Sequence, residues 1–123
     1  MSLALDWVRN AENRWPTLSA IDLKDPQLQE AEGVYIIFHG GMNPGIVSVG
    51  QGKIGDQVKA ESQDKGVLEF EKFKLYIAWA QTGKEERPGI EKYLSEKLSP
   101  KVSRPSLEAE AIPVNLPWRK NKQ

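Results

Sequence analysis

The chain of 123 residues contains no cysteine, which excludes disulfide bonds and thiolate metal sites. It also lacks an apolar run of about 18 residues, so no membrane-spanning helix and no membrane partner are expected. The first ten residues do not follow the basic-then-apolar order of a signal peptide. By elimination, we expect a cytoplasmic protein.

A surplus of either charge sign is also absent. Lysine plus arginine and aspartate plus glutamate number 17 each, so the formal net charge is zero. Proteins that bind nucleic acid through its phosphates usually carry a basic surplus or a basic face. The balance therefore weakens the case for strong binding to nucleic acid. The length suits one modest hydrophobic core, and we expect residues 1–123 to form a single domain.

Hydrophobic spacing in the first half of the chain predicts a helix and a β-hairpin. Residues 3–13 repeat apolar side chains every three or four positions, which indicates a short helix that ends before Pro16. A polar loop is expected around residues 22–26. Residues 33–39 are rich in β-branched and aromatic types and predict a strand. A glycine-rich turn joins them to a second short strand at residues 46–49.

The second half is predicted to contain a helix, a strand, a helix and an extended tail, at residues 54–64, 74–80, 86–98 and 111–116. We expect Gly50-Gln51-Gly52 to end the second strand. The strand at 74–80 is mostly apolar on both faces, which favours a central position. Together these elements predict an α+β fold with a small, mostly antiparallel three-stranded central sheet flanked by helices.

Three short motifs occur in order along these elements. Gly33-Val34-Tyr35 lies in the first strand, Ser48-Val49-Gly50 ends the second, and Glu91 begins a helix with Pro100 nine residues later. This order resembles the GIY-YIG nuclease domain over about residues 31–103. That family carries Gly-Ile-Tyr, Tyr-Ile-Gly and a helical glutamate followed by proline at these points. The resemblance implies a GIY-YIG-like core on which the N-terminal helix and the C-terminal tail pack.

The resemblance also implies a site that cleaves phosphodiesters. In the family a tyrosine positions or deprotonates the attacking water, an arginine balances charge on the phosphate, and a glutamate holds a divalent ion. Tyr35 and Glu91 retain two of these roles, and the implied cofactor at Glu91 is Mg²⁺ or Mn²⁺. Ser48 replaces the second tyrosine, Gln57 replaces the arginine, and Ser103 replaces an asparagine.

Of these replacements, Gln57 in place of the arginine is expected to reduce phosphodiester cleavage most. Glutamine can donate a hydrogen bond to phosphate but carries no charge, and charge-assisted bidentate contacts are stronger. Loss of such a group typically slows a reaction by roughly a hundredfold to a thousandfold. Lys53 precedes the predicted helix and is the better substitute. Lys59 lies two residues beyond Gln57 and points away from it.

Each retained residue also has a structural interpretation. Tyr35 is equally well explained as a core tyrosine, and Glu91 as a carboxylate favoured by the dipole at a helix start. Three functions stay open. The first is a degenerate GIY-YIG domain with weakened or lost cleavage, which binds DNA, another nucleic acid or protein. The second is an active metal-dependent endonuclease that uses Tyr35, Glu91 and a lysine. The third is a protein-interaction domain without nucleic acid. Zero net charge favours the first and third.

Overall fold

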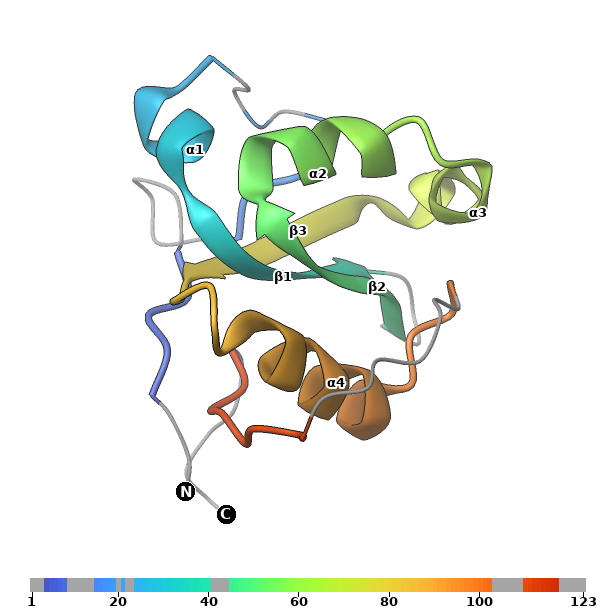
Figure 1. Ribbon diagram of the computed structural model, residues 1–123. Coiled ribbons are helices and arrows are strands. Elements are labelled where there is room, and N and C mark those ends of the chain that lie inside the picture. Colours follow the sequence, from blue (N-terminus) through green and yellow to red (C-terminus); the bar gives the residue numbers. More distant parts are fainter. Residues whose placement is uncertain are drawn as a thin grey trace.

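The computed structural model describes residues 4–8, 15–19, 21, 24–40, 45–102 and 110–117. It confirms the α+β fold, with a three-stranded antiparallel sheet flanked by helices (Figure 1). In chain order the elements are α1 (Pro26–Glu30), β1 (Glu32–His39), β2 (Gly45–Lys53), α2 (Ile54–Glu61), α3 (Lys65–Leu68), η1 (Glu71–Phe73), β3 (Leu75–Gln81) and α4 (Arg87–Leu98). Of these, η1 is a single turn of 3₁₀ helix.

The central strand is β1, because the strand order is β2-β1-β3. The predicted hairpin of β1 and β2 is confirmed, but the predicted central position of the third strand is wrong. The outer edge of β3 is instead covered by the N-terminal part of the chain. Leu18 N donates to Leu75 O at 2.8 Å, and Ile77 N donates to Pro16 O at 3.0 Å. Both faces of this edge strand are apolar because both are buried: Leu75, Ile77 and Trp79 belong to one core, and Ala78 and Ala80, on the opposite face, are fully buried.

Strand β2 is longer than predicted, because Gly50-Gln51-Gly52 continues the strand and does not end it. Gly50 pairs with Tyr35, and Gly52 pairs with Gly33. Gly52 has a φ of 127°, a conformation that residues with a side chain rarely adopt. The glycine thus lets the paired strand turn directly into α2.

The sheet separates two hydrophobic cores. We call its two sides the α2 face and the α4 face, after the helix that packs on each, and Figure 1 shows these helices on opposite sides of the sheet. The core of the α2 face includes Tyr35, Ile37, Val58, Val67 and Trp79. The core of the α4 face is formed by Val34, Ile36, Val49, Ile90, Leu94 and Val114. Alternation along β1 therefore sends neighbouring side chains into different cores.

The prediction of a helix over residues 3–13 is wrong for residues 4–8, which are not helical. Their backbone groups bond to other parts of the chain. Leu5 N donates to Asn115 Oδ1 at 2.6 Å, and Asn115 Nδ2 donates back to Leu5 O at 3.0 Å. Val8 N donates to Trp79 O at 2.8 Å. These long-range bonds replace the local helical ones, and the rest of that prediction lies outside the described residues.

The later helices agree better with prediction. Helix α4 matches the predicted 86–98 to within one residue, whereas α2 ends at Glu61 and not at residue 64. Short helices stand where none was predicted: α1 begins within the expected polar loop, and α3 and η1 fill the connection before β3. The longest described helix, α4, has 12 residues. No described helix combines the length and the apolar character needed to cross a membrane.

The extended tail predicted at residues 111–116 is not helical and packs against α4. Ile112 N donates to Gly89 O at 3.0 Å. Val114 is 6% exposed and belongs to the core of the α4 face. The tail therefore packs beside the first turn of α4 and contributes to the core of the α4 face.

Candidate functional site

Three of the predicted site residues converge on the α2 face. Tyr35 comes from β1, Ser48 from β2 and Gln57 from α2. The Tyr35 hydroxyl lies 3.3 Å from Gln57 Oε1. Gly50 makes room for this arrangement, since a methyl group there would lie 2.7 Å from Cε2 of the Tyr35 ring. The glycine of the second motif is thus required by the tyrosine of the first.

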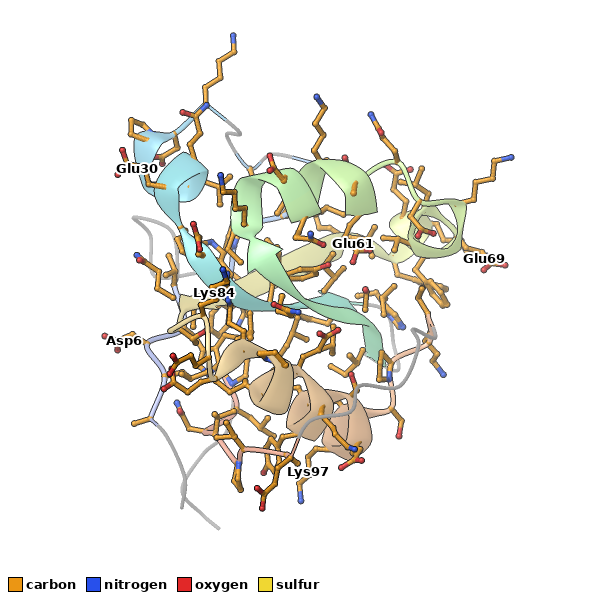
Figure 2. All side chains as sticks on the ribbon, viewed as in Figure 1. Asp6, Glu30, Glu61, Glu69, Lys84 and Lys97 are labelled. Carbon is orange, nitrogen blue, oxygen red and sulfur yellow. The ribbon has the colours of Figure 1, made fainter. Side chains whose placement is uncertain are left out.

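A residue that the sequence analysis missed, Glu61, completes this group. The Tyr35 hydroxyl donates a hydrogen bond to Glu61 Oε2. Ser48 Oγ donates to the same oxygen at 2.9 Å. Figure 2 shows Glu61 between α2 and the sheet. The sequence held a signal for it, because Ile54, Val58 and Glu61 are spaced by four and three residues and share one helix face.

We call Tyr35, Ser48, Gln57 and Glu61 the Glu61 cluster. Burial of a carboxylate is costly unless hydrogen bonds replace the lost water. Glu61 is 3% exposed, and the two hydroxyl donors supply these bonds. Tyrosine has a single hydroxyl proton, which bonds to Glu61, and 3.3 Å is long for an O–H···O hydrogen bond, so the contact with Gln57 is the weaker one.

Access to the Glu61 cluster is uneven. Tyr35 is 1% exposed and Ser48 is fully buried, whereas Gln57 is only partly buried. Its amide nitrogen lies beside the backbone of Gly52, where an added Cβ would stand 3.3 Å from Nε2. Gln57 is therefore the member through which the cluster reaches the surface.

Glu91 belongs to the other layer of the fold. It lies on α4, whose neighbouring residues Ile90 and Leu94 pack into the core of the α4 face. The Tyr35 hydroxyl lies on the α2 face, so the two retained residues approach the sheet from opposite sides. The structure brings Tyr35, Ser48 and Gln57 together and places Glu91 apart from them.

This division bears on the Mg²⁺ or Mn²⁺ ion that the resemblance implies. In the described part of the chain, no three His, Asp or Glu side chains form a group that could hold a metal ion. An ion at Glu91 would take its other ligands from water and from a phosphate. Because Glu91 and the Tyr35 hydroxyl lie in different layers, the donor set does not fit a metal centre shared by these two residues.

Lys53, the predicted substitute for the missing arginine, is exposed at the N-cap of α2. Its own side chain makes no capping hydrogen bond to the helix. An acidic residue, Asp56, follows in the first turn and is also exposed. Lys53 is thus a surface cation one helical turn before Gln57. Ser103, where the family has an asparagine, lies outside the described residues.

The only histidine in the sequence, His39, has a structural environment. It is 7% exposed at the end of β1. Its ring stacks on Phe70, with centroids 5.4 Å apart and planes 4° apart, and tilts against Phe73 at 5.2 Å. The aromatic packing joins the end of β1 to the α3–η1 segment.

The motifs that carry the GIY-YIG resemblance are two triplets and one glutamate–proline spacing. Their order along the chain and the convergence of Tyr35, Ser48 and Gln57 support a relationship to that family as a proposal. Comparisons with protein-family models, with curated proteins and with solved structures gave no match.

Proposed function

We propose that this chain is a GIY-YIG-like module of the cytoplasm that binds nucleic acid and has lost phosphodiester cleavage. The observation that carries the proposal is the bond from the Tyr35 hydroxyl to buried Glu61. A tyrosine that handles an attacking water must reach that water. Tyr35 is 1% exposed and its proton is committed to Glu61, so its role is to hold β1 against α2.

The remaining surface of the Glu61 cluster suits contact with a phosphate more than catalysis. The Gln57 amide nitrogen lies beside Gly52, and the exposed Lys53 follows in sequence. A neutral amide and one mobile ammonium can bind a phosphate oxygen, but they stabilise a developing charge less than a bidentate arginine does. The exposed carboxylate of Asp56 opposes phosphate at the same helix end. The binding is therefore weak and sensitive to salt.

Fluorescence anisotropy with labelled single-stranded DNA, duplex DNA and RNA tests the binding. We expect dissociation constants of roughly 10⁻⁴ to 10⁻⁶ M that weaken as salt rises. Lys53→Ala lowers the affinity at low salt and reduces the salt slope by about one. The matched control is Lys97→Ala, at an exposed lysine in the last turn of α4. Absence of binding at the lowest salt removes nucleic acid from the proposal.

A plasmid-nicking assay with Mg²⁺ or Mn²⁺ tests the loss of cleavage. The native protein and the Glu91→Ala variant should show the same background. Nicking by the native protein that disappears in Glu91→Ala would overturn the proposal and establish an active endonuclease. The two assays are independent, because a module can bind without cleaving.

A further inference from the structure

A cavity of about 420 Å³ lies between the N-terminal segment, the end of α2, the α3–η1 turns and the start of β3. Its apolar lining comes from Leu18, Leu68 and Leu75. Leu18 and Leu75 are each 5% exposed, whereas Leu68 is 37% exposed. The volume falls within the range of small-molecule sites in proteins.

One exposed apolar side chain lines this cavity, and another lies next to lining residues in the sequence. Among the described residues, Leu68 and Phe73 are the only large hydrophobic side chains classed as exposed. Leu68 lines the cavity, and Phe73 lies in sequence between the lining residues Lys72 and Lys74. A single exposed apolar residue is ordinary, but Leu68 continues the apolar lining that Leu18 and Leu75 form, so the cavity offers an apolar surface to a ligand.

The charged lining favours an anion. Lys72 and Lys74 face one acidic lining residue, Glu71. The Lys72 ammonium lies 5.3 Å from the centre of the Phe73 ring, which holds it by a cation–π contact. Lys74 forms no ion pair with any residue that the structure describes. Two lysines and one glutamate give the lining an excess of one positive charge, enough for a singly charged group.

The backbone of Lys74 is strained. Its φ of 67° and ψ of 117° lie in a region that glycine adopts readily and residues with a side chain rarely adopt. Hydrogen bonds hold it there: Lys74 N donates to Glu71 O at 2.9 Å, and Gly40 N donates to Lys74 O at 3.2 Å. Strain of this kind gathers at functional sites. A lysine at a position that suits glycine indicates a use for its ammonium.

We propose that this cavity binds a small amphiphilic carboxylate. The apolar body lies against Leu18, Leu68 and Leu75, and the carboxylate pairs with Lys74. A monoanion matches the excess of one positive charge in the lining better than a phosphate dianion does, since Glu71 repels the second negative charge. This site is separate from the Glu61 cluster, and its test does not depend on nucleic-acid binding.

Titration of ¹⁵N-labelled protein with octanoate, followed by NMR, tests the site. We expect saturable shifts that centre on the amides of Leu68, Lys72 and Lys74. Octanol, which lacks the charge, should bind several-fold more weakly, and octylamine should give no saturable shifts. Octylamine binding as tight as octanoate, or shifts that spread evenly without saturation, overturns the proposal.

Lys74→Gly separates ligand binding from stability. The change removes the ammonium and relieves the backbone strain, so octanoate affinity should fall about three- to tenfold. The melting temperature should rise by about 3–6 °C. The control Lys65→Ala, at an exposed lysine of α3 outside the cavity lining, should keep the affinity. Unchanged affinity in Lys74→Gly contradicts the proposed pairing.

Discussion

The two faces of the sheet are stabilised in different ways. On the α4 face, aliphatic side chains of β1 and β2 meet Ile90 and Leu94 in an apolar core, and the buried Arg87 of α4 pairs with Glu32 of β1. On the α2 face, aliphatic packing surrounds a buried carboxylate, Glu61, and the hydroxyls of Tyr35 and Ser48 that bond to it. The first face depends on filled volume, and the second depends also on every polar group having a partner.

The largest effect is expected from a cavity on the α4 face. Leu94→Ala should lower the free energy of unfolding by about 3–5 kcal/mol, because Leu94 is fully buried and its neighbours can fill the space only in part. Urea denaturation gives this value. Leu94→Met, which nearly conserves volume, should cost less than about 1.5 kcal/mol. Equal losses in the two variants would show that volume does not govern this face.

A smaller but different loss is expected on the α2 face. Glu61→Ala should cost about 2–4 kcal/mol, because it leaves the buried hydroxyls of Tyr35 and Ser48 without their acceptor. The same urea experiment measures it. Glu61→Gln keeps an acceptor oxygen and should lose less.

On the α2 face, removing the hydrogen-bond donors together with their acceptor should restore part of the lost stability. The triple variant Tyr35→Phe, Ser48→Ala, Glu61→Met removes the donors together with the acceptor. It should be more stable than the sum of the three single losses predicts, by at least about 1 kcal/mol. Strict additivity would mean that the hydrogen bonds of the cluster are not coupled, and the contrast between the faces would fail.

The next prediction concerns the contact between the two motifs. Gly50→Ala should cost about 1–3 kcal/mol, because the added methyl overlaps the Tyr35 ring. In a Tyr35→Leu background the same change should cost clearly less, since the ring is absent. The double-mutant cycle reports this difference. An equal cost in both backgrounds would place the strain in the β2 backbone.

Hydrophobic spacing and turn residues predicted correctly the elements whose formation depends mainly on neighbouring residues in the sequence. The hairpin at residues 33–49 and helix α4 carry strong spacing and turn signals, and both are present. The N-terminal helix failed because Leu5 and Val8 bond to Asn115 and Trp79, partners more than 70 residues away. No local propensity reports such partners. The central position assigned to β3 was wrong because apolar side chains report that both faces of a strand are buried, and they do not report which strands lie beside it.

The candidate site was only partly predictable. The motif order led to Tyr35, Ser48 and Gln57, which do meet. Glu61 was missed because a glutamate in a polar helix is ordinarily a solvated residue. Its spacing from Ile54 and Val58 was the available signal. The layer that Glu91 occupies depends on how α4 crosses the sheet, which motif spacing does not determine.

The smallest effect on stability is expected at Gln57. A substitution there tests whether residues from the two faces of the sheet act in one active site. Gln57→Arg restores the charge that the GIY-YIG resemblance implies. It removes only the long contact with the Tyr35 hydroxyl at a partly buried position, so it should cost no more than about 1 kcal/mol. Because the Tyr35 hydroxyl stays bonded to Glu61 and Glu91 lies in the other layer, no nicking with Mn²⁺ should appear. Lys59→Arg, at an exposed lysine of α2, is the control. If Gln57→Arg gains nicking and Glu91→Ala then abolishes it, the two faces meet in one active centre, and this chain is a nuclease that a single lost guanidinium holds inactive.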